Sequence, residues 1–233
     1  MAYIIINGRS SDEVRGLLIQ ELPPITLPKM RTQIATVDGR AGDIVTPLGY
    51  EAYDKKVKIG LYGAYDVDQV IAFFAQSGTV TFSNELTKYY RFQMIAQVDF
   101  NRLLRFRTAD VTLHVQPYKF STTEAARTIE DNVGHSATVY NLGNTGSRPT
   151  LTVAGSGNIG ISINGVQVLQ IALGTEDSIT INADEMNAYN GGTLKNRLVT
   201  GDYSKVSFLP GANTLSWTGT VASVTVSNAS RWI

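Results

Sequence analysis

NIGISINGVQVLQI, residues 158–171, is the stretch that decides the fold class of this chain. Apolar residues alternate with small or polar ones on both sides of Asn164-Gly165, as in strands that bury one face. Asn and Gly both tolerate the positive φ values of a type I′ turn, so they can join two strands tightly. Residues 158–171 are therefore predicted to form a β-hairpin.

The remainder of the last hundred residues continues this pattern. Further strands are predicted at spacings typical of a β-sandwich, over residues 150–153, 178–181, 206–209, 214–217 and 221–226. The run GSGNIG, residues 155–160, matches the glycine pattern of dinucleotide-binding proteins, but β-type alternation follows it where that motif needs a helix. We interpret it as a glycine turn between strands.

The first half of the chain is predicted to be α+β. Its single expected helix begins at the N-cap Asp66, places Val67, Val70, Ile71 and Phe74 at helical spacing, and ends at Ser77-Gly78. Residues 117–130 are interpreted as a link to the second half. Strands are expected over residues 3–6, 16–20, 33–37, 50–62, 79–82, 89–100 and 109–115. The fold class is thus mainly β, an α+β domain with one helix followed by a β-sandwich.

Composition supports two domains, 1–130 and 131–233. The first holds 15 of the 21 aromatic and 29 of the 40 charged residues, and the second holds 13 of the 21 glycines. Twenty basic and twenty acidic side chains give a net charge of zero, which provides no field to gather phosphates, so specific nucleic-acid binding is not expected. The absence of cysteine excludes disulfides and thiolate metal sites.

No catalytic, cofactor-binding or metal-binding residue can be assigned. His114 and His135 lack neighbouring ligands in the sequence, and no His-x-x-x-His pair occurs. The acidic pairs Glu176-Asp177 and Asp184-Glu185 are interpreted as solvated turn residues. Trp217 alternates with Leu215 and is expected in the core, whereas the position of Trp232 stays open. The chain is therefore predicted not to be an enzyme.

The apolar stretches are too short for membrane spans. The longest one after the N-terminal strand is Val70–Ala75, far below the ~20 residues that a bilayer requires. The first residues, Met1–Gly8, have no positively charged segment in front of a long apolar run. A soluble protein without an export signal is expected.

In their order and spacing, these features resemble the distal tail proteins of long-tailed bacteriophages, especially those that infect Gram-positive hosts. The resemblance spans nearly the whole chain. In the first domain it depends on Val37–Asp43, Gly49-Tyr50, Val57–Leu61, Asp66–Gln76, Gly78–Phe82, Tyr89–Phe92 and Asp110–Phe120. In the second it depends on Asn141–Asn144, Pro149, Ser162–Gly165 and Pro210–Trp217.

The resemblance implies that residues 1–130 build a ring and that residues 131–233 form a galectin-like β-sandwich facing outward. Members of the family form hexameric rings at the tail tip, between the tail-tube protein and the tail-tip protein, with attachment points for receptor-binding or baseplate proteins. DNA passes through the lumen without sequence recognition. No cofactor and no membrane are implied, and the expected location is the tail tip of a virion made in the host bacterial cytoplasm.

We also expect an arm that reaches the adjacent subunit of such a ring. The hypothesis places it in residues 37–53 because of their glycines, mixed charges and length. The residues expected at this subunit interface are Asp38, Gly39, Arg40, Gly42, Asp43, Glu51 and Tyr53. Two alternatives remain open: a carbohydrate-binding module acting in host-surface adhesion, and a β-fold hydrolase.

Overall fold

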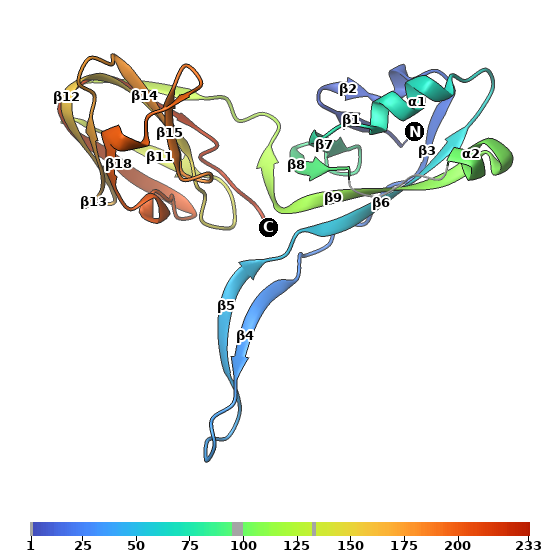
Figure 1. The fold of residues 1–233 in the computed structure, drawn as a ribbon, viewed down its shortest axis with the longest axis horizontal. Helices are drawn as coiled ribbons and strands as arrows, with labels where there is room; N and C mark the ends of the chain where they lie inside the picture. Colours follow the sequence, from blue (N-terminus) through green and yellow to red (C-terminus); the bar gives the residue numbers. More distant parts are fainter. Residues whose placement is uncertain (1, 95–99, 132–133) are drawn as a thin grey trace. The chain divides into compact units, whose positions relative to one another are not determined.

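The computed structural model describes residues 2–94, 100–131 and 134–233 (Figure 1). The chain is mainly β, as predicted. It divides into two compact units, Met1–Thr122 and Thr123–Trp232, each with its own hydrophobic core. Among the described residues, none of the helices has the length and apolar character that crossing a bilayer requires.

The first unit is built on one antiparallel sheet of seven strands. Neighbouring strands follow the order β2-β1-β7-β8-β9-β6-β3. Alternation places Val57 and Ile59 of β6 in the core, where both are 0% exposed. The strand bounds are β1 Ile4–Ile6, β2 Arg9–Ser10, β3 Leu17–Glu21, β6 Tyr53–Leu61, β7 Gly78–Phe82, β8 Lys88–Gln93 and β9 Thr108–Ser121, with a short 3-10 helix, η1, at Ser11–Glu13.

The expected helix is confirmed as α1, Val67–Phe74. The carboxylate of Asp66 caps it by accepting hydrogen bonds from the backbone N–H groups of Asp68 and Gln69, at 3.0 and 3.2 Å. The helix buries Val70, Phe73 and Phe74. It ends earlier than predicted, at Phe74.

A second helix, α2 at Phe100–Phe106, contradicts the prediction of a single helix. The predicted strand 89–100 was also wrong at its end, because β8 stops at Gln93 and Phe100 is helical; residues 95–99 lie outside the described residues. Burial of Leu103, 0% exposed, stabilises this short helix. Arg107, at φ 61°, follows its last turn.

The predicted link over residues 117–130 was wrong for most of its length. Strand β9 continues through Pro117 to Ser121, and Arg127–Glu130 form β10, which pairs with β18. Pro117 is tolerated because the ladder between β8 and β9 shifts register opposite it, between Tyr90 and Phe92.

The second unit is a nine-stranded antiparallel sheet that curls into two layers. Two long strands, β12 (Thr150–Ile163) and β18 (Gly211–Ser227), pair along most of their length and pass through both layers. One layer has the order β10-β18-β12-β14-β15-β16, and the other joins β11, β18, β12, β13 and β17. Strands expected over residues 214–217 and 221–226 are thus parts of one strand.

The remaining elements complete these layers. Residues 206–209, predicted as a strand, make only an isolated bridge between Phe208 and Ser147. The predicted hairpin at Asn164-Gly165 is confirmed, with φ values of 51° and 80°. The bounds are β11 Ser136–Asn141, β13 Val166–Ala172, β14 Ser178–Asn182, β15 Asn187–Asn190, β16 Thr193–Leu194, β17 Val199–Gly201, η2 Asn196–Leu198 and η3 Tyr203–Lys205.

The glycine turn expected over residues 155–160 is instead a bend within β12. The pairing of β12 with β18 shifts register after Ala154 and after Ser156. Close backbone approach requires glycine here: a Cβ on Gly155 would lie 2.3 Å from the carbonyl oxygen of Thr220, and one on Gly219 would lie 2.2 Å from that of Asn158. The bend lets both strands pass from one layer to the other.

Candidate functional site

The most distinctive surface of the first unit is a separate two-stranded hairpin, β4 (Met30–Ala35) with β5 (Ile44–Tyr50), here called the arm (Figure 1). Its two strands pair with each other and with no strand of the seven-stranded sheet among the described residues. Every residue of β4 is exposed, as are the first five of β5. The arm therefore receives little support from its own unit.

The tip of the arm contains five of the seven residues predicted at the subunit interface. Asp38, Gly39, Arg40, Gly42 and Asp43 are all exposed in the turn between the strands. Gly39 and Gly42 have φ values of 81° and 79°, which glycine adopts without strain. The backbone N–H of Arg40 donates to the carbonyl of Val37 at 3.1 Å, so the tip is an ordered turn.

The other two predicted interface residues lie at the base of the arm. Glu51 donates its backbone N–H to the carbonyl of Lys29 at 2.8 Å, and the two side chains pair at 4.0 Å. Tyr53 is not on the arm: it begins β6, pairs with Val115 and is half-buried. The structure places the arm over residues 30–50, so it starts earlier than the segment 37–53 expected from the sequence.

The two paired strands β4 and β5 form the shaft of the arm, and they present apolar side chains on both faces of the hairpin. Ile34 and Val45 are cross-strand partners on one face and are 60% and 56% exposed. Ile44, paired with Ala35, lies on the opposite face and is 39% exposed. An isolated two-stranded hairpin is only marginally stable in water, and a run of exposed apolar residues is typical of an interaction surface.

A buried cation holds the chain segment that enters the arm. Lys55 is 3% exposed, and its Nζ donates to the carbonyl of Pro24 at 2.9 Å. The ammonium also lies 4.8 Å from the ring centre of Tyr90 and 5.7 Å from that of Phe82. Burial lowers the pKa of Lys55 to about 8, which the nearby Glu85 carboxylate opposes.

Neighbouring side chains complete this anchoring cluster. Glu85 pairs with Lys119 at 2.9 Å and accepts a hydrogen bond from the Tyr90 hydroxyl at 2.8 Å. Asn84 donates to the carbonyl of Pro23 at 3.1 Å. Sequence reasoning missed Lys55, although it follows the same alternation as the buried Val57 and Ile59.

The histidines each contact one carboxylate. His114 Nδ1 lies 2.8 Å from Asp54, and His135 Nδ1 lies 2.8 Å from Asp131. In the part of the chain that the structure describes, no group of three or more His, Cys, Asp or Glu side chains could hold a metal ion. Each histidine thus has a carboxylate contact that the sequence did not reveal.

Glu176 lacks the raised pKa of a general acid. Glu176 accepts hydrogen bonds from Lys195 and Asn190, both at 2.7 Å, and these bonds lower the pKa of its carboxyl group. A general acid needs a raised pKa at neutral pH.

Trp217 is 2% exposed, and its indole N–H donates to Asp131 at 2.7 Å. It packs in the core as predicted and offers no stacking platform to a sugar.

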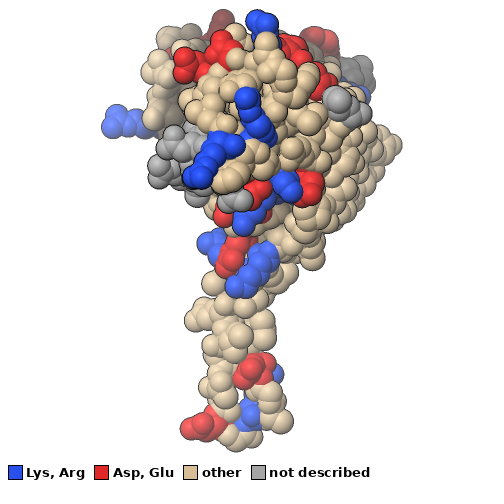
Figure 2. All heavy atoms as spheres, turned by 90° about the vertical axis from the view of Figure 1, so that its right-hand side faces the viewer, with Lys and Arg blue, Asp and Glu red and all other residues tan. Residues whose placement is uncertain are grey.

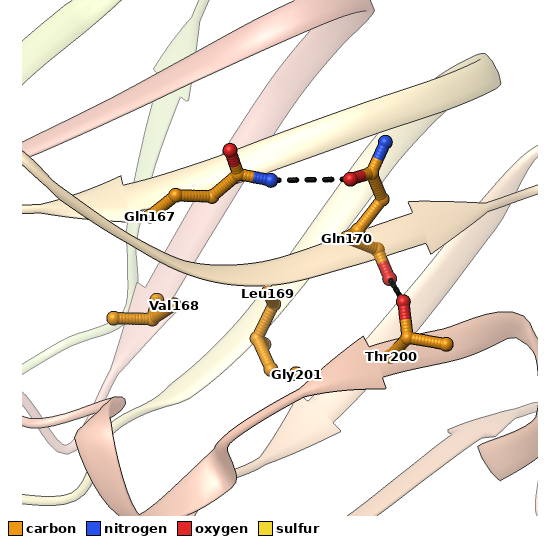
Figure 3. Close-up of a pocket in the computed structure, with 6 residues that line it drawn as sticks. All are labelled: Gln167, Val168, Leu169, Gln170, Thr200 and Gly201. Atoms are coloured by element: carbon orange, nitrogen blue, oxygen red, sulfur yellow. Dashed lines mark hydrogen bonds between the residues drawn. The ribbon is translucent and has the colours of Figure 1, made fainter.

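A shallow hollow of about 240 Å³ lies in the second unit where β13 meets β17 (Figure 3). Gln167 donates to the Gln170 side chain at 3.2 Å, and the Thr200 hydroxyl donates to the Gln170 carbonyl at 3.5 Å. The rest of the lining is Val168, Leu169 and Gly201. Because none of these six side chains titrates near neutral pH, the hollow offers no acid–base chemistry.

Comparisons with known proteins place these features in context. No protein-family model and no curated protein matches the chain. The Dit (gp 19.1) protein of phage SPP1, described as a paradigm of the hub adsorption apparatus in phages infecting Gram-positive bacteria, has a TM-score of 0.68 at 14% identity over 100% of both chains. Two structures of the phage P2 baseplate in its activated conformation, with Ca and with Sr, have TM-scores of 0.51 and 0.52 at 11% and 12% identity, with 98–100% of the chains covered. Over its full length, the chain therefore shares the fold of the SPP1 Dit hub protein.

Proposed function

We propose that this chain is a structural protein of a phage tail tip, a distal tail hub whose copies close into a hexameric ring. The ring joins the tail-tube protein to the tail-tip protein and carries receptor-binding or baseplate proteins. The fold shared with the SPP1 hub protein and the P2 baseplate supports this role. So does the arm, whose exposed apolar shaft needs a partner surface.

The arm is the observation that carries the proposal. Within the part of the chain that the structure describes, its two strands pair only with each other, while Ile34, Val45 and Leu48 stand exposed. Covering them with a neighbouring copy removes apolar area from water and stabilises the hairpin. When the arm of one copy contacts a different part of the next copy, the contact is head-to-tail. Such contacts form a closed ring where the rotation from copy to copy closes, and an open filament where it does not.

The two halves of the chain would divide the work. The first unit, with the arm and the seven-stranded sheet, would build the ring, and the second unit would form a galectin-like sandwich that faces outward. A near-neutral chain suits a conduit, because DNA has to pass without being held. The role requires no catalysis and no cofactor.

Light scattering on purified protein tests the proposal. The wild-type chain of 25.3 kDa is expected to assemble to about six times that mass. A variant in which Asn-Gly replaces residues 32–48 keeps the root of the arm and removes its shaft and tip, and it is expected to stay monomeric with an unchanged circular dichroism minimum. Equal masses for the two proteins would contradict the proposed role of the arm.

A further inference from the structure

Charge is distributed unevenly along the arm. The tip carries Asp38, Arg40 and Asp43, with a net charge of −1, and the root carries Lys29, Arg31 and Glu51, with a net charge of +1. The residues between them, 32–37 and 44–50, carry no charge. Figure 2 shows charged side chains at the tip of the hairpin and around its base, with uncharged surface along the shaft.

The charged groups at both ends are available to a partner. The side chain of Lys29 is 81% exposed, and that of Glu51 is 42% exposed. Asp38 and Asp43 are exposed as well. The ion pair between Lys29 and Glu51 is long, at 4.0 Å, so the Lys29 ammonium keeps most of its hydration and can approach another carboxylate.

The length of the arm matches the size of one neighbouring unit. At ~3.3 Å per residue, the seven residues of β5 rise roughly 23 Å, and the turn of residues 36–43 extends the reach beyond the strands. A small domain has a diameter of about 30 Å. An arm that crosses one neighbour therefore ends near the place where the neighbour's own arm begins.

We infer that the arms of adjacent copies run head to tail, so that the acidic tip of each arm meets the basic root of the next. The inference rests on the proposed ring. Each copy then uses its tip toward one neighbour and its root toward the other, which gives the ring a direction. The shaft between the two ends passes over the neighbour, where one of its exposed apolar faces is covered.

Charge complementarity favours a second copy as the occupant. A partner without complementary charge would leave the net negative charge of the tip uncompensated. The opposite signs of tip and root also disfavour tip-to-tip contacts, because like charges repel. The same chain thus carries both halves of the contact.

Two full-length variants and their mixture test this inference. The tip-reversed variant carries Asp38→Lys and Asp43→Lys, and the root-reversed variant carries Lys29→Glu and Arg31→Glu. Alone, each variant places like charges at every contact, and the protein concentration for half-assembly is expected to rise at least about tenfold at 0.15 M salt. Mixed in equal amounts, the variants restore opposite charges in alternating order, and assembly is expected to return to the wild-type concentration.

Two controls distinguish an effect of charge on assembly from a loss of folding. All four substituted positions are exposed, and the contacts that the substitutions remove lie within the arm and at its base, so both variants should keep the wild-type thermal unfolding temperature. A matched variant, Arg197→Glu with Lys205→Glu, reverses two exposed cations of the second unit and is expected to assemble as the wild type does. Recovery in the mixture shows by itself that both variants are folded.

Zero-length carbodiimide coupling provides the independent readout. It is expected to join Asp38 or Asp43 of a heavy-isotope copy to Lys29 of a light copy, even where association is weak. If wild-type rings form without this cross-link, or if either variant assembles normally alone, the head-to-tail contact between tip and root is contradicted and the proposed ring is not. Wild-type protein that neither assembles nor forms the link overturns both. If the mixture of the two variants forms only dimers, the proposal that each copy contacts one neighbour through its tip and the other through its root is contradicted.

Discussion

If the apolar shaft of the arm is buried at the contact between copies, replacing its exposed apolar side chains should weaken assembly. Replacing Ile34 and Val45 by serine removes one cross-strand apolar pair without touching the charged ends of the arm. Burying such a side chain completely stabilises by about 1.5–3 kcal/mol. Because Ile34 and Val45 are 60% and 56% exposed, covering the rest at a subunit contact contributes about 1–1.5 kcal/mol each.

The double variant should therefore weaken each subunit contact by about 2–3 kcal/mol, or roughly 30- to 150-fold in Kd. The isolated chain should hardly change, since both side chains are already exposed, and its free energy of unfolding is expected to stay within about 1 kcal/mol. A concentration series by light scattering measures the first quantity and urea unfolding measures the second.

Val166→Ser is the matched control, because Val166 is an apolar residue of the second unit with 57% exposure. This variant is expected to assemble at the wild-type concentration. If Ile34→Ser with Val45→Ser also assembles normally, or if Val166→Ser weakens assembly equally, the arm is not the subunit contact.

Three further predictions concern the folded chain. The pKa of Lys55 is lowered to about 8 from an ordinary 10.5, so above pH 8 the unfolded chain binds more protons than the folded chain does. The free energy of unfolding, measured by urea titration, should therefore rise by up to about 2 kcal/mol between pH 8 and 9.5. The variant Lys55→Met should abolish this rise. Leu103→Ala should destabilise the first unit by about 2–5 kcal/mol if α2 packs in the core, and a change below 1 kcal/mol would contradict that packing. Gly219→Ala should lower the free energy of unfolding by about 2 kcal/mol or more beyond the effect of Gly157→Ala, as measured by thermal unfolding. Both glycines have positive φ, but only a Cβ on Gly219 would meet backbone atoms. Equal effects of the two substitutions would show that space at the bend does not matter.

Local patterns predicted the parts of this fold that local physics determines. The hairpin at Asn164-Gly165 follows from the φ values that these two residues tolerate, and α1 follows from a capping aspartate and an apolar stripe. Helix α2 has only seven residues and no comparable pattern; its stability comes from burial of Leu103, which depends on distant strands. The sequence alone therefore gave no reason to expect it.

The long strands of the second unit escaped prediction for a related reason. Residues 155–160 have the composition of a turn, but the glycines there serve a bend that depends on Thr220 and Gly219, more than sixty residues away. Separate strands were predicted wherever glycine interrupts an apolar run. Only the partner strand distinguishes a bend from a turn.

The arm was predicted in part. Its tip was recognised from glycines and charges, whereas its first strand was predicted over residues 33–37 and begins earlier, at Met30. Lys55 was overlooked because a lysine in a strand is usually solvated, and its burial depends on the rings of Tyr90 and Phe82. That these features serve a subunit contact stays a prediction.

Electron microscopy of the purified chain shows whether copies close into a ring through their arms. Annular particles with six-fold symmetry are expected, in which each arm lies across the adjacent copy. Uniform single copies with uncovered arms at every concentration, or particles whose arms make no contact with a neighbour, would contradict it.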